Sequence, residues 1–251
     1  MARHRHIRRP LASARVLVGH RRSIGTDFAL ATILAFIAGA ANAGGFFALG
    51  KYTSHMTGYL SQFADNLASG SLLLAGSALL AILSFVSGAA ASSLMINWGR
   101  SRRSRERYAY PLAVQGVLLA SFSTGGMLES GLWRLSALAG LCFIMGMQNA
   151  TITKISYARV RTTHATGMVT DIGIEIGRAI CGRVFPGSGI AANRDKLRIL
   201  LTLVLAFLIG GITGALGYAV MGFGFSLPLA GLLFALSLPV LVPRRSGIRT
   251  A

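Results

Sequence analysis

Long apolar stretches divide this chain, and they restrict its fold more than any other feature of the sequence. A helix of about twenty apolar residues crosses the ~30 Å hydrocarbon core of a bilayer. Six stretches meet or approach that length: residues 28–49, 71–98, 108–128, 132–152, 197–221 and 225–242. The sequence therefore predicts an all-α integral membrane protein with six transmembrane helices.

The charged residues are few and strongly unbalanced. Only 13% of the chain is charged, about half the usual share in soluble domains, and 25 Lys and Arg residues stand against 7 Asp and Glu. A net charge of +18 is compatible with nucleic-acid binding only where the basic residues share a soluble face. Here they lie in blocks between the apolar stretches, so we expect a lipid bilayer and no nucleic acid as the partner.

The basic blocks also predict the orientation of the chain. All but two of the Lys and Arg residues fall in the two tails, the second–third connection and the fourth–fifth connection. Loops rich in Lys and Arg face the cytoplasm. We therefore expect both termini in the cytoplasm, with Lys51 and Arg134 on the external side. The first span is expected to act as an uncleaved anchor, because no signal-peptide pattern precedes it.

Three short patterns occur twice, in the same order. The pattern F-I-x-G-x-x-N-A at residues 36–43 recurs at 143–150, and a His-x-Thr-Gly segment at 55–58 recurs at 164–167. Phe85-x-x-Gly88 resembles Phe207-x-x-Gly210. Because an odd number of spans separates equivalent positions, the second half is expected to be inverted in the membrane. The predicted organisation is a basic cytoplasmic tail (1–26), a first three-helix repeat (27–128), a second, inverted three-helix repeat (129–242) and a basic cytoplasmic tail (243–251).

Each repeat is also expected to contain a short helix after its His-x-Thr-Gly segment. The stretches 58–67 and 167–180 have helical character, and each follows a threonine, Thr57 or Thr166. Threonine is a favoured N-cap because its hydroxyl accepts a hydrogen bond from a free backbone N–H. The sequence leaves open whether these helices enter the membrane or lie at its surface.

The motifs resemble those of a known family. A-G-A-x-N-A-G-G-F-x-A-L-G at 38–50, S-H-M-T-G at 54–58, M-G-M-Q-N-A at 145–150 and R-T-T-H-A-T-G at 161–167 are similar to the YoaK family, small bacterial membrane proteins also described as a domain of unknown function. The resemblance covers residues 26–242. It implies a six-helix protein of the bacterial inner membrane and supplies no substrate. Relatives carry Asp at the position of Asn42 and Asn at that of Tyr59, so a coupling role for an acid there does not carry over.

The repeated motifs supply the candidate site residues. An amide inside a membrane needs a polar partner, a helix N-terminus suits an anionic group, histidine titrates near neutrality, and an intramembrane acid is a functional candidate. The candidates for a solute path are Asn42, His55, Thr57, Gly58, Gln148, Asn149, His164, Thr166, Gly167 and Asp171. The structural alternatives stay open: interhelical bonds for the amides, capped interfacial helices, and pairing of Asp171 or Glu175 with Arg178.

Inverted repeats are common in secondary transporters. The first hypothesis is therefore a transporter or permease of a small solute, with an anion as one candidate, working by alternating access. The alternative is a non-transporting scaffold or sensor that acts through its basic cytoplasmic face. An enzyme ranks last, because no nucleophile–base pair or metal cluster is visible, and we expect no cofactor and no bound metal. The spacing Gly210-x-x-x-Gly214 is compatible with a homo-oligomer.

Overall fold

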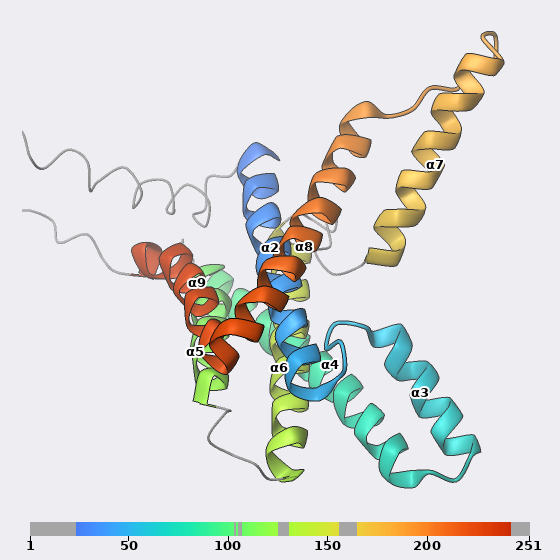
Figure 1. Cartoon of the computed structure of the whole chain (residues 1–251). Coiled ribbons are helices and arrows are strands. Elements are labelled where there is room, and N and C mark those ends of the chain that lie inside the picture. Colours follow the sequence, from blue (N-terminus) through green and yellow to red (C-terminus); the bar gives the residue numbers. More distant parts are fainter. Residues whose placement is uncertain (1–23, 103, 105–106, 125–130, 156–164, 242–251) are drawn as a thin grey trace, which may run out of the picture.

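The fold is helical throughout the part of the chain that is described. The computed structural model describes residues 24–102, 104, 107–124, 131–155 and 165–241. Its elements, shown in Figure 1, are α2 (Ile24–Leu49), α3 (Met56–Ala68), α4 (Leu72–Ser101), α5 (Ala109–Phe122), α6 (Gly131–Ile155), α7 (Ala165–Val184), α8 (Arg194–Met221), the short 3-10 helix η2 (Gly222–Phe225) and α9 (Ser226–Leu241).

Four helical stretches are long and apolar enough to cross a membrane. They are Gly25–Leu49, Leu72–Ser101, Leu132–Lys154 and Arg194–Leu241. The last contains both α8 and α9, which are separated by η2 at Gly222, where φ is 56° and glycine is favoured. These stretches indicate a multi-pass integral membrane protein, and they confirm the apolar spans predicted at 28–49, 71–98, 132–152 and 197–221.

The third predicted span is shorter than expected. We predicted a helix over residues 108–128, but α5 ends at Phe122, and residues 125–130 lie outside the described residues. Its 14 residues are about 21 Å long at 1.5 Å per residue, which is less than the hydrocarbon thickness. α5 packs against α9, the other short apolar helix, where the ring of Phe234 fills the space beside Gly116. Hydropathy alone gave no sign of this shortening.

The two short helices after the repeated segments are present, but their predicted caps are wrong. α3 begins at Met56 and α7 at Ala165, so Thr57 and Thr166 lie inside the first turns. His55 occupies the N-cap position of α3 without a side-chain capping bond. A Cβ atom on Gly58 would overlap the His55 ring, so the imidazole covers the first turn of α3 and glycine leaves room for it.

α2 and α6 form the centre of the bundle, and each crosses one long outer helix. α2 packs on α8 and α6 packs on α4. At the crossings, a Cβ atom on Gly39, Gly210, Gly88 or Gly146 would overlap a backbone carbonyl of the opposite helix. The backbones therefore touch, as small residues permit in membrane helices.

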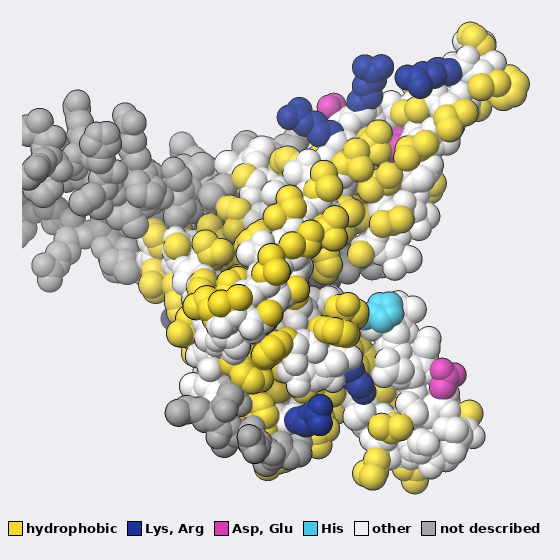
Figure 2. Space-filling model, in the orientation of Figure 1, with side chains coloured by type: hydrophobic (Ala, Val, Ile, Leu, Met, Phe, Trp, Pro, Cys, Tyr) yellow, Lys and Arg dark blue, Asp and Glu magenta, His cyan; other side chains and the backbone are white. Residues whose placement is uncertain are grey.

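The outer helices present apolar side chains away from the bundle. Leu73 and Leu94 on α4, and Leu216 and Val220 on α8, are exposed, and Figure 2 shows many hydrophobic side chains along the course of α8. Such a surface would be unfavourable in water and is suited to lipid.

Two arms extend from the bundle on one side. α3 packs along α4, and α7 packs along α8. Figure 1 shows that the two pairs diverge from each other, and Figure 2 shows the surface hollowed between them. This hollow contains the candidate site.

Candidate functional site

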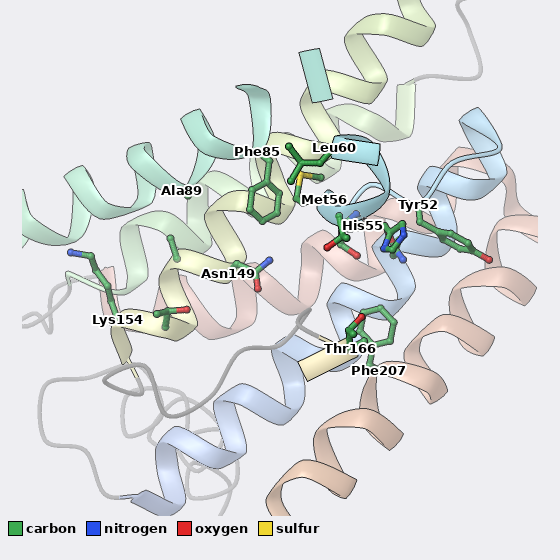
Figure 3. A pocket seen from close by; sticks show the side chains of 16 residues that line it. Tyr52, His55, Met56, Leu60, Phe85, Ala89, Asn149, Lys154, Thr166 and Phe207 are labelled. Atoms are coloured by element: carbon green, nitrogen blue, oxygen red, sulfur yellow. Dashed lines mark hydrogen bonds between the residues drawn. The ribbon is translucent and has the colours of Figure 1, made fainter. Parts of the chain in front are cut away.

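A cavity of about 1040 Å³ lies where the two arms meet the central helices (Figure 3). Its volume matches that of pockets for small organic molecules and greatly exceeds what a single ion needs. The wall is formed by α2, the connection before α3, and parts of α3, α4, α6, α7 and α8. The lining residues are Asn42, Tyr52, Ser54, His55, Met56, Thr57, Leu60, Phe85, Ala89, Asn149, Ala150, Thr153, Lys154, Ala165, Thr166 and Phe207.

The first turn of α3 and the first described turn of α7 both lie at this cavity, and the two helices run away from it. Met56 and Thr57 of α3 share the wall with Phe85, which is thirteen residues, about 20 Å, along α4 from Leu72. Thr166 of α7 shares it with Phe207, at a similar distance along α8. The first turn of α3 and the first described turn of α7 therefore lie near the middle of the spans on which these helices pack.

Asn42 connects α2 to the segment that precedes α3. Its side chain is only 8% exposed, and its Oδ1 accepts a hydrogen bond from the backbone N–H of Ser54 at 3.2 Å. This bond holds the connection against α2. Because Oδ1 accepts it, Nδ2 is the end of the amide that is left to donate toward the cavity.

The amides of the second motif have different roles. Asn149 lines the cavity, and its Nδ2 donates to the Met145 carbonyl of its own helix at 3.2 Å. Gln148 is buried outside the cavity and donates to the Leu34 carbonyl of α2. Gln148 thus forms an interhelical hydrogen bond, which is the structural alternative given above for the amides of the motifs.

Only some of the remaining motif residues line the cavity. His55, Thr57 and Thr166 line the cavity, and Gly58 lies beneath the His55 ring. Gly167 belongs to the first turn of α7 and is not among the lining residues. His164 lies outside the described residues.

Asp171 lies away from the cavity, in an ion-pair group that joins α7 to the start of α8. Its carboxylate is 3.4 Å from Lys196 Nζ. Glu175 is fully buried and pairs with Arg178 at 3.1 Å, which confirms the predicted i, i+3 pair. Glu175 also accepts a hydrogen bond from the N–H of Asn193, whose side chain caps α8 by accepting from the N–H of Lys196. These contacts fix the outer end of the α7–α8 arm.

Lys154 and the aromatic walls of the cavity are not among the predicted site residues. Lys154 was assigned to orientation, yet it lies at the edge of the cavity, where its Nζ donates to Asn97 Oδ1 at 3.2 Å. Lys154 follows Asn149 within two turns of α6. This short spacing was the sequence signal that could have placed Lys154 near the site. Phe85 and Phe207 had been noted only as parts of repeated patterns.

The cavity wall has an unusual charge content. Lys154 and His55 are the lining residues that can carry a positive charge, and no Asp or Glu is among those that the structure describes. The described residues also contain no group of three or more His, Cys, Asp or Glu side chains arranged to hold a metal ion. The wall therefore offers hydrogen-bond donors and apolar surface rather than metal ligands.

One protein family matches most of the chain. Residues 30–238 match the family described as "Protein of unknown function (DUF1275)". No curated protein and no solved structure matches the chain. The family match includes every residue that lines the cavity and both copies of the repeated motifs, and it confirms the resemblance to the YoaK family. The chain belongs to the DUF1275 family, which is the YoaK family.

Proposed function

We propose that this protein is a transporter or permease that carries a small solute across the bacterial inner membrane. The observation that carries the proposal is the lining of the central cavity by both copies of the repeated motifs. Asn42 and Asn149 face it, as do Thr57 and Thr166. Phe85 and Phe207, the first residues of the third repeated pattern, form part of the wall.

The helix crossings support an arrangement of two equivalent halves, residues 27–128 and 129–242. Gly39 of α2 contacts the Phe207 carbonyl of α8, and its counterpart Gly146 of α6 contacts the Phe85 carbonyl of α4. The reverse contacts correspond in the same way, with Gly210 against Phe36 and Gly88 against Phe143. If each residue is replaced by its counterpart in the other half, each of these contacts turns into another contact of the set. This is the pattern expected of repeats related by an approximate two-fold axis.

Inversion of the second repeat would give the two arms separate tasks. With both termini in the cytoplasm, the α3–α4 arm would lie toward the external side and the α7–α8 arm toward the cytoplasm. Exchange of conformation between equivalent halves would then open the cavity first to one side and then to the other. Such a protein needs neither a catalytic step nor a cofactor of its own.

The exposed Arg residues of the α7–α8 arm favour a second candidate, a non-transporting scaffold or sensor. Arg178, Arg183, Arg194 and Arg198 are all exposed, and Figure 2 shows Lys and Arg side chains gathered at the outer end of this arm. A scaffold would use this surface for a partner and would not require a solute in the cavity.

A ligand screen separates the two functions. Detergent-purified protein is heated with a panel of organic acids, neutral metabolites and amines. A ligand at 100 times its Kd stabilises the folded state by about 2.7 kcal/mol. We expect at least one stabilising compound, and we expect Asn42→Leu and Asn149→Leu each to remove its effect and its flux into proteoliposomes.

Asn66→Leu is the matched control, because Asn66 is a half-buried amide of α3 that donates to the Gln62 carbonyl and does not line the cavity. This variant should retain both binding and flux. Absence of any stabilising compound, or unchanged flux in both cavity variants, would contradict transport through the cavity and favour the scaffold.

A further inference from the structure

The distribution of charge around the cavity indicates which solutes it can accept. We infer that the cavity takes a small organic anion, a carboxylate with an apolar body, whose acidic group is bound by Lys154. This inference rests on the proposed function and specifies the class of substrate. The chain has seven acidic residues, and their positions decide whether the cavity carries an unpaired positive charge.

None of the acidic residues described in the structure can neutralise Lys154. Asp171 and Glu175 are paired with Lys196 and Arg178, and Asp65 is exposed on α3. Asp27 and Asp195 do not line the cavity, and Glu106 and Glu129 lie outside the described residues. The adjoining stretch 156–164, also outside them, contains no acid in its sequence.

The partner of Lys154 in the structure is neutral. Its ammonium group donates to the amide oxygen of Asn97, and no carboxylate of the described residues lies within ion-pair distance of it. Lys154 lies in the last turn of α6, at the end of the apolar span Leu132–Lys154, and its side chain is only half-buried. An anionic solute would supply the opposite charge there.

Other hydrogen-bond donors in the cavity wall also favour an anion. The Nδ2 group of Asn42 remains available to donate, and α3 begins at the cavity, which adds the partial positive charge of a helix N-terminus. Several hydroxyl groups accompany them, including those of Thr57 and Thr166. An anion therefore meets donors from several sides, whereas a cation would meet no carboxylate.

The apolar part of the cavity wall favours a solute with an apolar body. Phe85, Met56 and Leu60 lie together in Figure 3, with Lys154 at one end of the cavity and Phe207 on another side. An inorganic ion would leave most of the 1040 Å³ empty or filled with water. A carboxylate with an aliphatic or aromatic body can use the ammonium group and the apolar wall at the same time.

The test compares compounds that differ only in charge. Full-length protein in detergent is titrated with hexanoate and benzoate, with their neutral amides, with benzylamine, and with phosphatidylglycerol in mixed micelles. Thermal unfolding gives each affinity. We expect the carboxylates to stabilise the protein and the amides and the amine to have little effect. Equal stabilisation by acids and amides, or stabilisation by the lipid alone, would overturn the inference.

Variants then locate the charge that binds the solute. Lys154→Met should weaken carboxylate binding by about tenfold, because it removes the ammonium group that donates to the carboxylate. Lys154→Arg should keep most of the affinity. Lys51→Met is the matched control, because Lys51 does not line the cavity. Carboxylate binding that is unchanged in Lys154→Met would also overturn the inference.

The outcomes separate this inference from the proposed function. If an amide or amine stabilises the protein while the carboxylates do not, and Asn42→Leu removes that effect, the cavity binds solute but the substrate class is wrong. If no compound of any charge binds, both the substrate class and the transport function are wrong.

Discussion

Asp171 and Glu175 lie one turn apart on α7 and both approach Lys196, but their surroundings differ. Asp171 is 42% exposed, whereas Glu175 is fully buried. The buried carboxylate also pairs with Arg178 and accepts a hydrogen bond from the N–H of Asn193. The two ion pairs are therefore expected to contribute differently to the free energy of unfolding.

This difference gives a matched pair of variants. Asp171→Ala should reduce the free energy of unfolding by about 1 kcal/mol or less, because exposed ion pairs contribute little. Glu175→Ala should reduce it by about 1–3 kcal/mol, because the Asn193 N–H loses its acceptor. Denaturant unfolding in detergent measures both changes, and hydrogen exchange should show the loss of protection concentrated at the α7–α8 junction. Equal effects of the two substitutions would contradict this account.

At this scale, the sequence predicted contacts within one helix better than contacts between segments. The Glu175–Arg178 pair followed from i, i+3 spacing. The contact of Glu175 with Asn193 depends on how α7 folds back on α8, which no local pattern contains. The N-cap assigned to Thr57 was wrong because the connection held by Asn42 allows α3 to begin earlier, at Met56.

Two glycines of α6 illustrate how the elements pack. A Cβ atom on Gly146 would overlap the Phe85 carbonyl of α4, whereas a Cβ atom on Gly140 would have no neighbour within 4 Å among the described residues. Both positions are helical, so the intrinsic preference for alanine over glycine is similar at each.

Substitution of these glycines tests the helix crossing. Gly146→Ala should lower the free energy of unfolding by about 1–3 kcal/mol, because α4 and α6 must separate. Gly140→Ala should leave stability unchanged or raise it by up to about 1 kcal/mol. Thermal unfolding of both variants in the same detergent gives the comparison. Tolerance of Gly146→Ala equal to that of Gly140→Ala would argue against close backbone contact at this crossing.

The sequence predicted which elements exist better than how they meet. Hydropathy identified the long helices α2, α4, α6 and α8, since a span needs about twenty apolar residues. It overestimated α5, because an apolar stretch does not show where a helix ends inside a bundle. The pairing of α2 with α8 and of α4 with α6 depends on tertiary contacts, which no local pattern predicts.

For the molecule as a whole, the repeated motifs were the most useful sequence signal for the site. They indicated Asn42, His55, Thr57, Asn149 and Thr166, all of which line one cavity. They did not indicate Lys154, because its counterpart position in the first half is not a lysine and its charge matched the orientation rule. A charge in a connection and a charge at the end of a cavity look alike in a sequence with this many basic residues.

The proposed transport requires a cavity that opens alternately to the two sides of the membrane. The test uses sealed vesicles of both orientations and a variant in which Cys142 and Cys181 are replaced by alanine. A single cysteine is then introduced at Ala150, which lines the cavity. Cysteines at the exposed positions Asp65 and Arg183 serve as references, expected to react only from the external and only from the cytoplasmic side respectively.

A membrane-impermeant maleimide reports the accessibility of the cysteine at position 150. Alternating access predicts that it reacts from both sides, and that a stabilising solute slows the reaction from each. Reaction from one side alone, or protection from both sides without solute, would contradict the account.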